Sequence, residues 1–542
     1  MRELLAKVDS DALKKEVLKI PLVSELRSLK QLTSPKDLAA FLVSYYGGDL
    51  LEVSSVRQIV FSLLPLPALN DLCRGLSLPE SRYVYDAALV LSTAPWTYSS
   101  ALPTRIRAEL EKRLHKTIPE EFMPAEPLPR PPSIEEIYSE ELQPLFAYQQ
   151  EMSDRVYALL AEGNRRAMLQ MPTGSGKTRT VMHAVVRRLS ALDRDSLILW
   201  MAHSEELCEQ AIESFRRSWL EYGEGRARIY RLWGAHKISQ DKLSSGIVIA
   251  SLQKLHSLRV RRDEVYNRLS NSVSAIVFDE AHKALARTYH QLIEDLTGAG
   301  TKKVLLGLSA TPGRAVLEAI ANERLAEVFE HRLIAPTFGG KDPLTALREQ
   351  GILAHIKRKV IANTNDYGLT QEEGRYLRDF LDFPESLLER VGRDEKRNLL
   401  LIGEILGQVR QEKQCIVFAC SVNHAKLLAA MVAMRGVSAC AITSDMRYSS
   451  RVRSIDGFRK KDFDVIVNYG ILTTGFDAPN VGAVIIGRPT ASIVLYSQMI
   501  GRGLRGPKVG GKEQCMVVEV VDNVKGFGAD SEVYDYFKDY WN

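Results

Sequence analysis

The sequence predicts an α/β protein with two parallel-sheet domains in tandem, preceded by a mostly α-helical N-terminal domain. Short apolar runs rich in Val, Ile and Leu alternate with amphipathic helical stretches from about residue 141. Buried parallel strands joined by crossover helices have this pattern. The alternation stops over residues 336–395, which read as charged helices, and resumes over 396–542. We therefore predict sheet domains at 141–335 and 396–542, joined by a helical connector.

The composition is that of an ordinary globular protein, with 45% hydrophobic and 26% charged residues. A chain of 542 residues is too long for one core, so about three domains are expected. The formal net charge of +5 is a mild lean toward polyanionic partners. Six cysteines without a C-x-x-C pair read as free thiols in a reducing cytoplasm, with no structural zinc. The sequence lacks a signal peptide and an apolar run long enough for a membrane span.

The front of the chain, residues 1–121, reads as helices with short loops. A proline-rich stretch over 122–140, containing FMPAEPLPRPPS, then predicts a stiff linker. We interpret the helical front as a module that docks a protein partner or contacts DNA. Such a module is expected to be dispensable for the chemistry of the rest of the chain.

A phosphate-binding loop is predicted at QMPTGSGKT (170–178), which follows an apolar run and precedes a helical one. Small residues there let backbone N–H groups face phosphate oxygens, with help from the positive end of the helix. Lys177 is placed to neutralise β- and γ-phosphates, and the Thr178 hydroxyl to bind Mg²⁺. The other residues expected to cradle a nucleotide are Thr173, Gly174, Ser175 and Gly176. The competing interpretation, a glycine-rich surface turn, leaves the flanking strand and helix unexplained.

Paired acids end the apolar run AIVFDEAH (275–282). Ligands of open α/β sheets lie at the carboxyl ends of strands, so Asp279 is a candidate Mg²⁺ ligand. Glu280 would then orient and deprotonate an attacking water. The alternative is that these acids cap the next helix; the upstream phosphate loop favours the first interpretation.

Further segments resemble the motifs of superfamily 2 DEAH-box helicases, in the order of that family. They are LFAYQQ (145–150), LWMAHSEELCEQA (199–211), VIASLQKLHS (248–257), LGLSATPGR (306–314), ILTTGFDAPNV (471–481) and YSQMIGRGLRG (496–506). The resemblance is closest to the RadD-type bacterial DNA helicases and covers about residues 141–525. It implies two RecA-like domains that bind ATP and Mg²⁺ between them.

The resemblance also implies roles for single residues. Gln149 is the expected adenine contact, and Gly475 and Asp477 are expected near the ribose and the water. Ser309 and Thr311 would couple hydrolysis to domain movement. The residues that would hold nucleic acid are Ser204, Glu205, Ser251, Gln253, Thr473 and Thr474. Short hydroxyls and amides grip phosphate without reading bases, so the track is expected to be bound independently of sequence.

The segment YSQMIGRGLRG (496–506) would supply cations from the second domain to a nucleotide bound between the two domains. Arg502 and Arg505 are one helical turn apart, so both are expected to face the nucleotide. An arginine finger is worth about 10³–10⁵ in rate. Gln498 is expected to position the γ-phosphate or the water. The alternative is a solvated basic helix start, in which Gly501 and Gly503 would be costly.

Together these observations predict a nucleic-acid-stimulated ATPase, an ATP-dependent DNA helicase or translocase acting on single-stranded or forked DNA. DNA repair in the bacterial cytoplasm is the expected setting. Two alternatives stay open: a motor subunit of a restriction-like or anti-phage defence complex, and an RNA-remodelling ATPase. DNA over RNA rests on the family resemblance alone.

Overall fold

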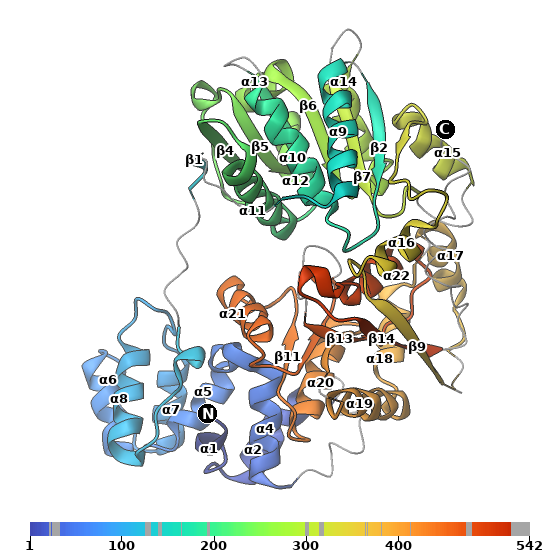
Figure 1. Cartoon of the computed structure of the whole chain (residues 1–542). Helices are drawn as coiled ribbons and strands as arrows, with labels where there is room; N and C mark the ends of the chain where they lie inside the picture. The colour runs from blue at the N-terminus through green and yellow to red at the C-terminus, as the bar shows by residue number, and fades with distance from the viewer. Residues whose placement is uncertain are drawn as a thin grey trace.

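Two parallel sheets and a helical front make up the chain, which confirms the predicted fold class (Figure 1). This computed structural model describes residues 1–20, 23, 33–124, 132–138, 144–163, 165–191, 196–298, 303–313, 319–363, 365, 367–380, 382–411, 413–472 and 480–521. Among these residues, no helix combines the length and the apolar character that crossing a membrane requires.

The first sheet has eight strands in the order β1-β4-β5-β3-β6-β7-β2-β8. All neighbours run parallel except β1 and β4. The strands are β1 (Ile134–Tyr138), β2 (Arg166–Gln170), β3 (Leu197–Ala202), β4 (Arg226–Leu232), β5 (Gly246–Ser251), β6 (Val273–Asp279), β7 (Val304–Ser309) and β8 (Leu333–Ile334). The inner strands are apolar throughout because helices cover both of their faces.

Alternate side chains of these strands point to opposite helical layers. Leu169 of β2 packs in the core under α9 (Ala147–Glu162), α10 (Lys177–Ser190) and α11 (Glu205–Tyr222). Met168 packs on the other face, under α12 (Leu252–Val260), α13 (Glu264–Ser272), α14 (Arg287–Thr297) and α15 (Ala319–Val328). Short 3₁₀ turns lie at η4 (Gln240–Lys242) and η5 (Ala281–Lys283).

The second sheet has six parallel strands in the order β11-β12-β10-β13-β14-β9. The strands are β9 (His355–Ala362), β10 (Gln414–Phe418), β11 (Ala439–Ile442), β12 (Val465–Asn468), β13 (Val481–Ile486) and β14 (Gln514–Val521). Its helices and turns are α19 (Glu395–Val409), α20 (Val422–Ala433), α21 (Tyr448–Arg459), α22 (Ile493–Ile500), η6 (Gly501–Gly503) and η7 (Pro507–Val509).

The segment 336–395 differs from the predicted helical connector. It contains α16 (Pro343–Glu349), α17 (Gln371–Phe380) and α18 (Glu385–Gly392), but also β9, which extends the second sheet along β14. Its residues HIKRK look unlike a buried strand because β9 is an edge strand that leaves charges in solvent. Arg358 pairs with Glu519 at 2.8 Å, and Lys359 with Glu404 at 2.6 Å.

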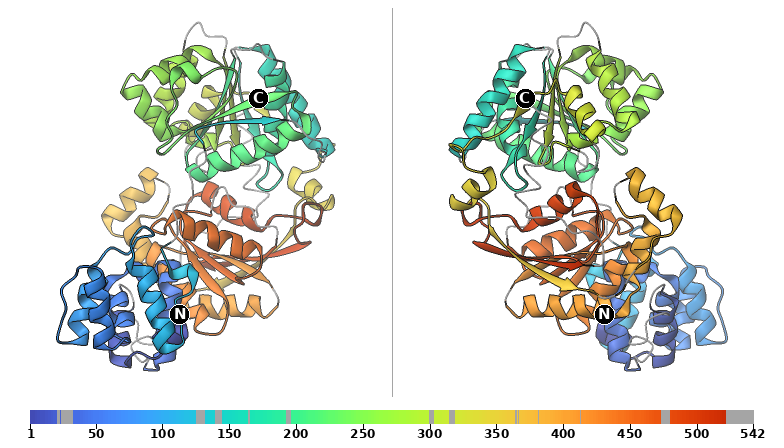
Figure 2. Two further views of the ribbon diagram at one scale, coloured as in Figure 1. Left: turned by 90° about the vertical axis from the view of Figure 1, so that its left-hand side faces the viewer. Right: turned by 90° about the vertical axis from the view of Figure 1, so that its right-hand side faces the viewer.

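The helical front packs on the second sheet domain, at the end of the molecule away from the first (Figures 1 and 2). Its elements are α1 (Arg2–Leu5), α2 (Ser10–Lys19), α4 (Pro35–Tyr46), η2 (Gly47–Glu52), α5 (Ser54–Phe61), α6 (Leu66–Gly75), α7 (Val84–Thr93), α8 (Leu102–Leu114) and η3 (Glu120–Phe122). Helix α4 lies along α20, and the Tyr45 hydroxyl meets the Asn423 amide oxygen at 3.3 Å. Arg447 of α21's N-terminal cap pairs with Asp49 at 2.7 Å.

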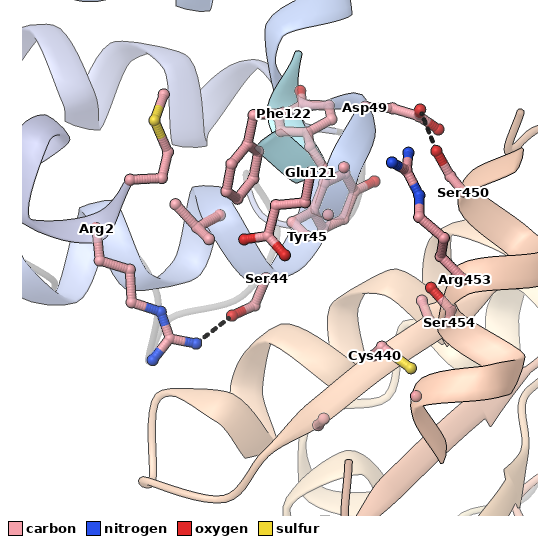
Figure 3. A pocket seen from close by; sticks show the side chains of 18 of the residues that line it. Arg2, Ser44, Tyr45, Asp49, Glu121, Phe122, Cys440, Ser450, Arg453 and Ser454 are labelled. Atoms are coloured by element: carbon pink, nitrogen blue, oxygen red, sulfur yellow. Dashed lines mark hydrogen bonds between the residues drawn. The ribbon is translucent and has the colours of Figure 1, made fainter. Parts of the chain in front are cut away.

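A cavity of about 880 Å³ opens beside this contact, between the front and α21 with β11 (Figure 3). Tyr45, Asp49 and Phe122 line it from one side, and Cys440 and Arg453 from the other. The Ser450 hydroxyl donates to Asp49 across its rim at 3.2 Å. The cavity is lined by both parts of the chain, so it exists only while they stay docked.

The front and the second domain share one apolar core. Removal of the front should therefore destabilise the second domain and not leave it active. Helix α20 is apolar and buried over most of its surface, as a helix covered on both sides must be. We expect deletion of residues 1–124 to uncover α20 and give an aggregating protein. Size-exclusion chromatography and thermal unfolding test this.

The matched control is Tyr45→Phe, which removes only the hydrogen bond to Asn423 and should cost about 0.5–1.5 kcal/mol. A monodisperse truncated chain that hydrolyses ATP would contradict the shared core and restore the picture of a dispensable module.

Candidate functional site

Predicted site residues of the first sheet domain gather at one edge of its sheet. The strands β5, β3, β6, β7 and β2 are consecutive neighbours, and each carries a predicted motif directly after its carboxyl end. This edge is where open α/β sheets bind ligands. Strand order thus places the motifs side by side although up to 139 residues separate them in the chain, from Gln170 to Ser309.

The loop between β2 and α10 has the shape of a phosphate cradle. Gly174 and Gly176 both have φ of +85°, a conformation that favours glycine. The Ser175 N–H donates to the Pro172 carbonyl at 3.1 Å, which closes the turn. Lys177 begins α10, so the N-terminus of that helix adds its partial positive charge. Met171, where a glycine is common in such loops, is fully buried and fills the core below.

Gln149 holds this loop from behind. Its side-chain amide donates to the Ser175 carbonyl at 3.0 Å, and its oxygen accepts the Phe146 N–H at 3.2 Å. The Tyr148 hydroxyl donates to the same carbonyl. A Cβ at Gly176 would lie 2.3 Å from the Gln149 amide nitrogen, so the close approach requires glycine. Gln149 therefore supports the cradle here, and its expected adenine contact stays a prediction.

The paired acids stand at the end of β6, beside the loop. Asp279 is buried, and its carboxylate accepts the Glu280 N–H at 3.0 Å. Glu280 has φ of +56°, a left-handed conformation that is strained for this residue. Backbone strain of this kind persists where the surroundings impose it, often at functional sites.

Electrostatics separate the two acids. Burial raises the pKa of Asp279 to about 6, with the Lys177 charge opposing it. Burial also acts to raise the pKa of Glu280, but Lys177 and neighbouring basic groups outweigh it and lower that pKa to about 2. Lys177 lies close enough to both carboxylates to favour their ionised forms. A bound cation stabilises the ionised form of a buried acid whose pKa is raised. The oxygens of Asp279 and Thr178 therefore suit a hard ion such as Mg²⁺.

The motif after β7 connects the loop to the acids. The Ser309 carbonyl accepts the Met171 N–H at 3.2 Å, and its hydroxyl donates to the Thr311 carbonyl at 2.6 Å. The same hydroxyl lies 3.5 Å from Nδ1 of His282, which in turn lies 3.4 Å from Glu280. Ser309 therefore connects Thr311 to the acids through His282, and the coupling role of Ser309 and Thr311 stays a prediction.

The second domain reaches the loop from the opposite side. Arg505 donates from Nη1 to the Gly174 carbonyl at 3.2 Å. A Cβ at Gly501 would lie 2.2 Å from the Thr173 methyl carbon, so glycine permits the contact. The amide nitrogen of Gln498 is buried here and donates to no residue that the structure describes. The two walls predicted for an interdomain site do meet.

Arg502 and Arg505 do not share one regular helix turn, which differs from the expectation. Helix α22 ends at Ile500, η6 follows, and Arg505 comes after it. Two glycines of low helix propensity follow Ile500, and a Cβ at either would clash, with Thr173 at Gly501 and with Cys515 at Gly503. Arg502 donates from Nε to the Gln498 carbonyl at 3.2 Å, and Arg505 donates to the loop.

The residues predicted to hold nucleic acid divide into two groups. Ser204 and Ser251 are N-caps, accepting N–H groups of Leu207 and Lys254 at 3.3 and 3.2 Å. They lie at the ends of adjacent strands, since Ser251 pairs with Ala202, two residues before Ser204. Glu205 and Gln253 follow them at the same edge. Thr473 and Thr474, like Gly475 and Asp477 of the nucleotide prediction, lie outside the described residues.

Three features of the site were not predicted from the sequence. Tyr148 supports the loop, and His203 lies at the end of β3 between Gln253 and the acids. Arg451 of α21 pairs with Glu206 of α11 at 2.8 Å, which ties the two sheet domains together. The LFAYQQ and LWMAHSEEL segments could have directed attention to Tyr148 and His203, whereas the pairing of Arg451 has no sequence signal.

Two family models match the chain over this architecture. The model described as Type III restriction enzyme, res subunit, matches residues 143–314, and that of the helicase conserved C-terminal domain matches 397–506. IRC3 of Saccharomyces cerevisiae, assigned as an ATP-dependent helicase, is 27% identical over 384 residues, covering 69% of this chain and 51% of that protein.

Two further relatives are similar over the same part of the chain. Schizosaccharomyces pombe irc3, assigned as a mitochondrial ATP-dependent helicase, is 28% identical over 385 residues, covering 70% of this chain and 57% of that protein. The endonuclease subunit of the type I restriction enzyme EcoKI of Escherichia coli is 23% identical over 391 residues, covering 66% and 33% respectively. The chain thus spans about half the length of the first two relatives.

Proposed function

We propose, from the premise that this chain belongs to the superfamily 2 helicases, that it is an ATP-driven motor that moves along DNA or unwinds it. The observation that carries the proposal is the contact of Arg505 with the phosphate loop. A guanidinium from one domain lies at the phosphate cradle of the other, so hydrolysis depends on closure of the two domains. Closing and opening on a bound strand converts hydrolysis into movement.

The cradle binds the nucleotide in this proposal. Backbone N–H groups of Thr173, Gly174 and Gly176 would face the phosphates, and Lys177 would neutralise them. Thr178 and Asp279 would hold Mg²⁺, which supplies charge neutralisation on the phosphate oxygens when bound. We also place Gly475 and Asp477 near the ribose, and this placement rests on the family likeness alone.

Catalysis then requires a base and a second cation. Glu280 is ionised, 15% exposed and held in a left-handed backbone conformation, so it is placed to accept the proton of the attacking water. Arg505, with Arg502 nearby, stabilises charge on the transferred phosphoryl group. Gln498 carries a buried donor that a nucleotide oxygen would satisfy.

The track lies at the neighbouring end of the same sheet edge. Ser204, Glu205, Ser251 and Gln253 follow β3 and β5 and form one surface. The two serine hydroxyls already accept backbone N–H groups, so each has its own proton to donate to a phosphate oxygen. Thr473 and Thr474 of the second domain would continue the track. Binding through phosphates predicts little base preference and a strong dependence on salt.

An ATP hydrolysis assay with single-stranded, duplex and forked DNA, and with RNA in parallel, tests this function. We expect single-stranded or forked DNA to raise the rate by about tenfold, within the range usual for coupled sites. Stimulation by RNA alone would replace DNA by RNA as the track. A rate that responds to neither would contradict the motor. The RadD-type likeness and a repair role belong to the DNA branch of this proposal.

A second candidate is a motor subunit of a restriction-like or anti-phage complex. The observation that favours it is a group of exposed apolar side chains on α7 and its flanks: Tyr83, Tyr85, Leu89 and Tyr98. Such a group suits a protein partner. A lone motor should unwind forked DNA by itself, whereas a subunit should show only DNA-stimulated hydrolysis.

A further inference from the structure

One strand end separates the track from the catalytic acids. In the order β5-β3-β6, β5 leads into Ser251 and Gln253, and β6 leads into Asp279 and Glu280. The residue directly after β3 therefore lies between the track residues that follow β5 and the acids that follow β6. That residue is His203.

The main chain of His203 is held by the track side. The Gln253 side-chain amide donates to the His203 carbonyl at 3.0 Å. The amide carries two N–H groups, and a nucleic-acid phosphate that draws the amide toward itself would weaken its bond to this carbonyl. Binding of a strand at Gln253 thus changes how the end of β3 is held.

The His203 ring lies near enough to Glu280 and Lys283 to interact with their charges. Met201 pairs with Phe278, so His203 and Glu280 stand two residues beyond a matched pair on adjacent parallel strands. Nδ1 of His203 is buried and bonds to none of the described residues. Burial, with help from the Lys283 charge, lowers the pKa of His203 to about 4, so the ring is neutral and carries one N–H.

We propose that His203 is a positioning residue that transmits nucleic-acid contact at Gln253 to the Glu280 carboxylate; this rests on the proposed function. Without a strand, Gln253 anchors the His203 carbonyl and Nδ1 of the imidazole stays unbonded among the described residues, so Glu280 has the His282 ring beside it at 3.4 Å. With a strand, Gln253 turns to a phosphate, the end of β3 relaxes, and the imidazole N–H donates to Glu280. A carboxylate fixed by that hydrogen bond presents its free oxygen to the attacking water.

The simpler interpretation is that His203 only fills the turn after β3. A packing role would lower stability, or would reduce stimulated and unstimulated hydrolysis by the same factor. A transmitting role lowers the ratio of the two rates. The ratio is therefore the quantity to measure.

The test compares His203→Ala and His203→Asn with the unmodified full chain. Hydrolysis is measured with and without saturating single-stranded DNA and RNA, strand affinity by fluorescence anisotropy, and stability by thermal unfolding. We expect His203→Ala to lower the stimulation ratio about tenfold. Asn restores part of the ratio because its amide supplies a donor, and strand affinity and melting temperature are kept.

The matched control is His290→Ala on α14, another first-domain histidine whose Nδ1 is buried and bonds to no described residue. It should leave the ratio unchanged. Combining His203→Ala with Gln253→Ala should lower the ratio no further than His203→Ala alone, because both act on one route.

The outcomes separate the two proposals. An unmodified protein that no nucleic acid stimulates contradicts the proposed function. A stimulated protein whose ratio His203→Ala leaves unchanged, or whose two rates fall by the same factor, overturns the role of His203 alone. A double variant whose stimulation ratio falls by the product of the two single losses would also overturn the role of His203.

Discussion

Glu280→Gln is expected to lower the turnover of ATP by about 10³-fold, the middle of the range for a lost general base. The amide keeps the size of the side chain but cannot accept the proton of the attacking water. Nucleotide binding should persist, because the cradle and Lys177 are unchanged. Phosphate release under saturating ATP and nucleic acid measures turnover, and a fluorescent ATP analogue measures binding.

The control for this experiment is Glu213→Gln, a half-exposed carboxylate of α11 that pairs only with neighbouring arginines of its helix in the described structure. It should keep both turnover and nucleotide affinity. A Glu280→Gln protein that hydrolyses ATP at a rate near that of the unmodified chain would remove Glu280 from its role and reopen its reading as a helix cap.

Arg505→Ala is expected to lower turnover by about 10³–10⁵-fold, the range for a lost arginine finger. The physical reason is that Arg505 reaches the loop from the second domain and bonds to the Gly174 carbonyl at 3.2 Å. It therefore acts only when the domains are closed, and ATP affinity should change little. Arg505→Lys should recover only part of the loss, since an ammonium lacks the planar fork of a guanidinium.

Arg459→Ala provides the matched control, because Arg459 lies on the same domain and forms a surface pair with Asp456 at 3.3 Å. It is expected to keep full turnover. If Arg505→Ala instead weakens ATP binding as much as it slows hydrolysis, Arg505 is a ground-state contact and the finger must be sought at Arg502.

Local chemistry made much of the site predictable. A glycine loop between an apolar run and a helix is recognisable because the loop's neighbours are its structural context, so residues 173–178 were found without a structure. The same holds for Asp279 and Glu280, whose place at a strand end follows from seven apolar-rich residues. The regular helical turn predicted for Arg502 and Arg505 was not found, because Gly501 and Gly503 disfavour a continued α-helix and the chain forms η6 there.

Edge strands and domain contacts were harder to predict. β9 has the composition of a charged helix because its exposed faces need no apolar side chains, and only its pairing with β14 makes it a strand. The docking of α4 on α20 also escaped prediction, since an apolar helix face does not say which surface covers it.

The sequence by itself determined the motifs, the alternation of strands and helices, and the chemistry that each strand end carries, because these depend on residues close together in the chain. Only the tertiary structure decided the strand order, and with it that His203 separates Gln253 from Glu280 and that Arg505 meets Gly174. These contacts depend on hydrogen bonds and packing between segments far apart in the chain, and a local sequence pattern does not show which distant segments pair.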